Sequence, residues 1–186
     1  WQPQLLKSVR AAVSQSASQW RWQRAQNAGT PQPGTNAAEP DKALQVASDA
    51  LLQGRHAAAR GNRQDALAAL GRAQAALAKA EGKAEAWHFL EAALISRATG
   101  DNKQADAYGQ QALGRIDKQN AGRQRLLRAR TLIALGRFDA GEAALNGEGG
   151  APECAAALAI EDLRMVGQPD RATALARRIV AAAPKC

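Results

Sequence analysis

The sequence predicts an all-α protein built from repeated helical hairpins, and three observations support this prediction. Aromatic residues make up only 4% of the 186 residues, and alanine, leucine, glutamine and arginine dominate. This composition is typical of helices that pack closely through small side chains. Ala/Leu-rich stretches are interrupted at Gly61, Gly100, Gly136 and Gly167, which are separated by 39, 36 and 31 residues. That spacing falls around the roughly 34-residue period of helix-turn-helix repeats.

The first 40 residues differ from the rest of the chain. Residues 1–26 predict an amphipathic helix, because Leu6, Val9, Val13 and Trp20 recur at spacings of three, four and seven. Residues 27–40 concentrate Pro, Gly, Thr and Asn, which favours a linker. We therefore expect three parts: an N-terminal helix over 1–26, a linker over 27–40 and a helical repeat domain over 41–186.

Each of the four glycines begins the same short pattern. A polar turn follows the glycine, and a small residue stands five positions after it, at Ala66, Ala105, Gly141 and Ala172. The pattern resembles the turn of a tetratricopeptide repeat, in which glycine ends the first helix and the small residue lets the second helix cross closely. The segment 84–90 (AEAWHFL) is similar to the opening of such a repeat. The glycine-rich stretch 146–152 departs from the pattern, and the resemblance covers residues 41–186.

The resemblance implies a right-handed superhelical stack of about four repeats, to which the N-terminal helix is added. Its concave groove, lined largely by the first helix of each hairpin, is expected to bind a protein partner. The arginines among the expected contacts would clamp carboxylates of an acidic or peptide-like segment. For any one of them, the alternative is an ion pair with a nearby acid such as Glu161. The residues expected at the partner are Arg55, Trp87, His88, Leu94, Arg97, Arg123, Leu126, Arg130, Ile133 and Arg164, with Trp20 and Trp22 on the N-terminal helix.

Residues 19–24 (QWRWQR) interleave tryptophan with arginine. Such a segment suits a membrane interface or a nucleic-acid backbone. We expect it instead to cover the open side of the first repeat or to contact a partner helix, because terminal repeats need their apolar side covered. Membrane proximity through this region is the alternative.

The two cysteines bear on the cellular compartment. In the hairpin that the resemblance implies, Cys154 begins the first helix of the last repeat and Cys186 follows its second helix. Antiparallel helices bring these ends together, so we expect a disulfide, which in the chain-entropy model contributes about 3 to 4 kcal/mol. The alternative is two unrelated thiols. A disulfide indicates an oxidising compartment, and we expect the periplasm, with a signal peptide, a membrane anchor or other sequence ahead of Trp1.

The sequence carries no motif of a known catalytic or metal site. His56 and His88 are the only histidines and do not have metal-ligand spacing. No P-loop, dinucleotide-binding or G-x-S-x-G pattern occurs. We therefore expect no enzyme activity, no cofactor and no metal.

These expectations favour a non-enzymatic scaffold or assembly factor of the bacterial cell envelope, in secretion, pilus or envelope-complex biogenesis. The formal charge of +8 favours an acidic partner. It also leaves open a nucleic-acid-associated helical repeat protein, which an exported, disulfide-bonded chain would disfavour. A further alternative is the noncatalytic repeat portion of a larger enzyme.

Overall fold

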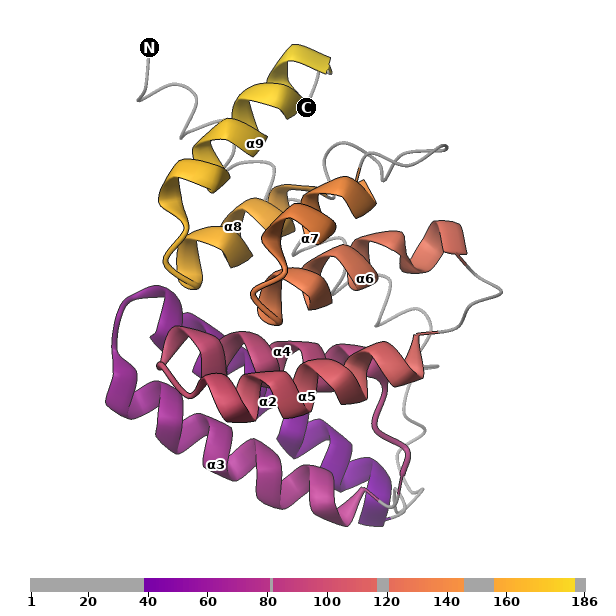
Figure 1. Cartoon of the computed structure of the whole chain (residues 1–186). Coiled ribbons are helices and arrows are strands. Elements are labelled where there is room, and N and C mark those ends of the chain that lie inside the picture. Colours follow the sequence, from indigo (N-terminus) through magenta and orange to yellow (C-terminus); the bar gives the residue numbers. More distant parts are fainter. Residues whose placement is uncertain (1–38, 81, 117–120, 146–155, 183–186) are drawn as a thin grey trace, which may run out of the picture.

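The computed structural model describes residues 39–80, 82–116, 121–145 and 156–182, and these ranges form α-helices without any β-strand (Figure 1). The all-α class is therefore confirmed. The predicted N-terminal helix, Trp20 and Trp22 lie outside the described residues. The helices are α2 (Glu39–Ala59), α3 (Arg63–Lys79), α4 (Ala86–Ala98), α5 (Asn102–Arg115), α6 (Ala121–Ala134), α7 (Phe138–Leu145), α8 (Ala157–Met165) and α9 (Pro169–Ala182).

Helix α2 starts at Glu39, two residues before the predicted start of the repeat domain at 41. Pro40 therefore lies in the first turn of α2. Proline is tolerated there because the first N–H groups of a helix have no intrahelical acceptor in any case.

Consecutive helices pair into four hairpins, α2/α3, α4/α5, α6/α7 and α8/α9 (Figure 1). The four turn glycines have φ values between +72° and +87°, a region that favours glycine. At Gly100, the glycine N–H donates to Arg97 O (3.1 Å) and the Asp101 N–H donates to Ser96 O (2.9 Å). The same two hydrogen bonds form at the other three turns. This is the Schellman pattern, and it confirms the predicted ends of the four first helices.

The small residue after each turn allows close helix crossing. Ala66, Ala105 and Ala172 have no exposed surface. At Gly141, a Cβ atom would lie 2.9 Å from Ile133 Cγ1 and 3.0 Å from the Ala129 carbonyl oxygen. The α7 helix therefore crosses α6 at a distance that leaves no room for a side chain.

The first helices of the hairpins form one layer. Helices α2, α4, α6 and α8 contact one another in this order, and each second helix packs on the first helix of its own hairpin (Figure 1). Helix α2 also contacts α8, so the first hairpin meets the last. This meeting brings together side chains that are far apart in the sequence.

Candidate functional site

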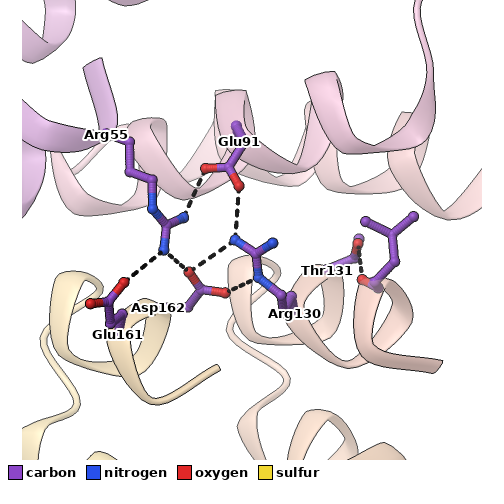
Figure 2. A network of polar contacts seen from close by, with 7 residues as sticks. Arg55, Glu91, Arg130, Thr131, Glu161 and Asp162 are labelled. Atoms are coloured by element: carbon purple, nitrogen blue, oxygen red, sulfur yellow. Dashed lines mark hydrogen bonds and ion pairs between the residues drawn. The ribbon is translucent and has the colours of Figure 1, made fainter. Parts of the chain in front are cut away.

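Four charged side chains meet inside the layer of first helices, one from each hairpin (Figure 2). Arg55 Nη1 lies 2.8 Å from Glu91 Oε2, and Arg55 Nη2 lies 2.6 Å from Asp162 Oδ1. Arg130 Nε lies 2.6 Å from Asp162 Oδ2, and Arg130 Nη2 lies 2.8 Å from Glu91 Oε1. The contacts close a ring in which positive and negative charges alternate. We call Arg55, Glu91, Arg130 and Asp162 the four-residue ring.

The four-residue ring is largely shielded from solvent. The side chains of Arg55 and Glu91 are 14% exposed, that of Arg130 is 10% exposed and that of Asp162 is fully buried. Every carboxylate oxygen of the ring accepts at least one hydrogen bond from a guanidinium group. Buried charges are costly unless they are paired and hydrogen-bonded, and the ring meets both conditions with two charges of each sign.

The protonation equilibria of the ring follow from burial and pairing. Burial by itself would raise the pKa of Glu91, but Arg55 and Arg130 hold this pKa at about 2, below its ordinary value. Burial would lower the pKa of Arg55, but Glu91 and Asp162 raise it above its ordinary value. The pKa of Arg130 is also raised, against burial, by Asp162 and Glu91. The two arginines and Glu91 are therefore charged at neutral pH.

Glu161 lies at the edge of the ring rather than in it. Its Oε2 atom is 3.8 Å from Arg55 Nη2, and its side chain is 39% exposed. Burial raises the pKa of Glu161, and the neighbouring Asp162 raises it further against the attraction of Arg55. Two adjacent acidic residues on α8 therefore differ sharply in environment.

The sequence predicted that Arg55 and Arg130 clamp a partner's carboxylates, but in this structure both arginines are engaged within the chain. Their guanidinium groups already bind Glu91 and Asp162 of the same chain. The alternative of intramolecular ion pairs describes both residues, and Glu161 is indeed near Arg55. These arginines act in the fold of the free chain.

Two apolar residues expected in the groove lie in the core instead. Leu94 and Ile133 have no exposed surface, and each belongs to a cluster of buried apolar side chains. Neither offers a surface to a partner in this conformation, because each is enclosed by the apolar residues of its cluster. Leu126 is half-buried and packs against the cluster that contains Ile133.

The other expected arginines are in different environments. Arg97 donates from Nε to Ala134 O (2.8 Å) and from Nη2 to Asp106 Oδ1 (2.6 Å), so it braces the end of α4 against α6. Arg164 is exposed on α8. Arg123 belongs to α6, but its side chain lies outside the described part of the structure.

Trp87 and His88 are stacked on each other at the start of α4, with ring centroids 3.7 Å apart. His88 is buried, and its Nδ1 atom accepts a hydrogen bond from the Glu85 N–H (3.1 Å). Its Nε2 atom is 3.4 Å from Ser48 Oγ, whose hydroxyl donates to Leu44 O. A neutral imidazole protonated at Nε2 satisfies all of these contacts. His88 therefore links α4 to α2, and Trp87 is half-buried beside it.

Sequence reasoning missed the two ring carboxylates, Glu91 and Asp162. Both lie within Ala/Leu-rich first helices, where a charged side chain without a partner would be costly. Arg55 and Arg130 stand six residues before their turn glycines, whereas Arg97 and Arg164 stand three residues before theirs. Grouping the arginines by this distance separates the two ring arginines from the other two.

A shallow cleft lies between α3 and α5, away from the ring. Its volume is about 270 Å³, and among the described residues that line it Arg115 is the one with a charged side chain. The Arg115 guanidinium carbon lies 4.2 Å from the centre of the Phe89 ring, a cation–π distance. The lining residues that the structure describes include no acid–base pair.

Two absences hold for residues 39–80, 82–116, 121–145 and 156–182, which the structure describes. In these ranges, no three side chains of His, Cys, Asp and Glu are arranged to hold a metal ion. No helix there has both the length and the apolar character needed to cross a membrane. Cys154 and Cys186 lie outside the described residues, so their pairing stays a prediction.

Comparison with family models, with curated proteins and with solved structures finds no match for this chain.

Proposed function

We propose that this chain is a noncatalytic, tetratricopeptide-like scaffold that binds an acidic segment of a protein partner and helps assemble a complex of the bacterial cell envelope. The observation that carries the proposal is the fourfold hairpin, with the same turn hydrogen bonds each time and one layer of first helices. Stacked hairpins of this kind form extended surfaces that suit peptide and protein segments. A right-handed superhelix is part of the same proposal.

The charges of the chain support a partner with acidic groups. The chain carries 25 Lys and Arg residues against 17 Asp and Glu residues. In the conformation described, Arg55 and Arg130 are engaged in the ring, so a partner that binds this conformation uses other cations. Arg128 on α6 and Arg164 on α8 are exposed and belong to first helices. We assign the partner's carboxylates to these arginines, since guanidinium groups bind carboxylates well.

The cysteines and the N-terminal segment support the cellular compartment named in the proposal. A disulfide between Cys154 and Cys186 would fit the periplasm. Residues 1–38 contain four basic and no acidic residues, which would favour a position near an anionic membrane surface. A bacterial envelope complex satisfies both expectations.

The proposal is tested by photo-crosslinking from defined positions in the native host. A photoreactive amino acid is placed at Arg128 or Arg164, with exposed Arg60 at the turn of the first hairpin as the matched control position. We expect a crosslinked protein that is captured from the first two positions and not from the control. Identical products from all three positions would contradict the assignment of the surface.

The captured protein then has to bind in purified form. We expect Arg128→Gln and Arg164→Gln each to weaken binding about tenfold or more, because each removes a charge-assisted hydrogen bond worth about 1.5 to 3 kcal/mol. Arg60→Gln should leave the affinity unchanged. A single-stranded oligonucleotide that binds more tightly than the captured protein, with a steep dependence on salt, would favour the nucleic-acid alternative.

A further inference from the structure

The four-residue ring joins the two ends of the hairpin array. Arg55 of the first hairpin contacts Asp162 and Glu161 of the last, at 2.6 Å and 3.8 Å. Among the described residues, these are the hydrogen bonds and ion pairs that run directly between the first and last hairpins. The polar part of the link between the ends is therefore centred on one guanidinium group.

The apolar cores of the two ends are separate. One cluster is built from α2, α3 and α4 and includes Leu51, Leu70 and Ile95. Another is built from α6 to α9 and includes Ile160 and Leu163. A third cluster around Leu90 and Leu94 lies between them. Both ends pack against this middle cluster, but neither end contributes to the core of the other.

The Arg55–Asp162 contact can open while the other three contacts of the ring remain. When the Arg55–Asp162 contact opens, Arg55 keeps Glu91 and Asp162 keeps Arg130. The Glu91–Arg130 contact between neighbouring helices also remains. Every charge in the opened chain is still paired, so opening avoids the large penalty of leaving a buried charge alone.

We propose that the Arg55–Asp162 pair is a latch, so that the array has a closed form and an open form in which the first hairpin separates from the last. The Arg55–Asp162 contact is a direct charge-assisted hydrogen bond of 2.6 Å, so separation of the first and last hairpins breaks it. Opening exposes the inner layer of first helices and frees one side of the Arg55 guanidinium for a carboxylate. Only this use by an acidic partner segment rests on the proposed function, because the latch is a property of the free chain.

The latch is tested by a distance measured across it. Nitroxide labels are placed at exposed positions on α2 and α8, through Gln53→Cys and Arg164→Cys, in the full chain with Cys154→Ser and Cys186→Ser. Double electron–electron resonance then compares this labelled chain with one that also carries Arg55→Met and Asp162→Asn. The double substitution removes the contact but leaves Glu91 paired with Arg130, so charge balance is kept.

We expect one narrow distance distribution in the labelled parent and a longer, broader one in the double variant, with unchanged helix content. Arg178→Gln is the matched control, because Arg178 pairs with Glu142 outside the ring and its loss should leave the distance unchanged. An unchanged distance in a folded double variant would overturn the latch. So would a lengthening of equal size in the control.

Hydrogen exchange on the unlabelled chain covers the case in which the double variant fails to fold. Arg55→Lys keeps the charge but not the two-sided guanidinium, and we expect it to speed exchange in α2 and α8 while α5 and α7 stay protected. Global unfolding of both variants would make the ring a condition of folding and would also overturn the latch. The measurement uses no partner, so its failure is distinct from failure of the proposed function.

Discussion

Arg55 Nη2 lies 2.6 Å from Asp162 Oδ1, although the two residues are 107 positions apart in the sequence. The contact connects the first helix of the first hairpin with the first helix of the last. Glu91 and Arg130 complete the four-residue ring from the two hairpins between them. The charges that composition alone would assign to a partner are thus used within the chain.

Removing one ring carboxylate should destabilise the fold much more than removing its neighbour. Asp162→Asn leaves two buried arginines with one carboxylate, and we expect a loss of about 3 to 5 kcal/mol in the free energy of unfolding. Glu161→Gln is the matched control, since Glu161 is partly exposed and burial already disfavours its charge. Its effect should stay within about 0.5 kcal/mol. Urea unfolding followed by circular dichroism measures both, and equal effects would refute the difference in environment.

A small carboxylate should replace the missing side chain in Asp162→Ala. The substitution leaves a space between two guanidinium groups that acetate fits in charge and shape. We expect acetate to raise the melting temperature of this variant saturably, with about 1.4 kcal/mol of stabilisation at tenfold excess over its Kd. Sodium chloride at equal ionic strength should have no such effect. A rise of the same size in Glu161→Ala would point to a nonspecific salt effect.

The lowered pKa of Glu91 predicts that the free energy of unfolding falls at acid pH. Because the folded-state pKa is about 2, below the ordinary value of 4.5, the charged form of Glu91 stabilises the fold at neutral pH. This contribution is complete above about pH 4.5 and is lost as the pH falls toward 2. Glu91→Gln should lower stability at pH 7 and flatten this part of the profile. Parallel curves for the parent and the variant between pH 5 and 2 would contradict the assignment.

The turn glycines and hairpins were predictable because they depend on local chemistry. A turn with positive φ favours glycine, and close helix crossing favours a small residue five positions later. Both residues can be recognised in the sequence, as at Gly100 and Ala105. The composition likewise predicted the helices. These features arise from contacts between residues close in the sequence, which a single sequence records directly.

The ring was not predictable, because it depends on how strongly the array curves. Arg55 and Asp162 meet only if the first and last hairpins meet, and no local pattern determines this. A degenerate repeat also leaves the register of each helix uncertain, so Leu94 was expected in the groove although it lies in the core. The contact between the first and last hairpins is therefore known only from the structure.

Two glycines should respond to alanine in opposite ways. Gly141→Ala would place a Cβ atom 3.0 Å from the Ala129 carbonyl oxygen, and we expect a loss of about 1 to 3 kcal/mol from overpacking. Gly71 lies in the exposed face of α3, where an added Cβ meets nothing within 4 Å. Gly71→Ala should stabilise the chain by about 0.5 to 1 kcal/mol. Thermal unfolding compares the two, and a stabilising Gly141→Ala would show that the α6–α7 crossing is looser than described.

The cysteines provide a test of the compartment. We expect Cys154 and Cys186 to form a disulfide in protein isolated from its native host, as measured by intact mass after alkylation under denaturing conditions with and without reductant. The bridged mass supports export to the periplasm. Two alkylated thiols before reduction would remove this support and favour the alternative of a nucleic-acid-associated repeat protein.

The coupling energy between Arg55 and Asp162 tests the central claim most directly. A double-mutant cycle with Arg55→Met, Asp162→Asn and the double variant isolates the interaction across the two ends of the chain. We predict that the two losses in unfolding free energy fall short of additivity when combined, with a coupling energy above about 1 kcal/mol. Additivity within about 0.3 to 0.5 kcal/mol would mean that the residues do not interact and that the hairpin array is not closed.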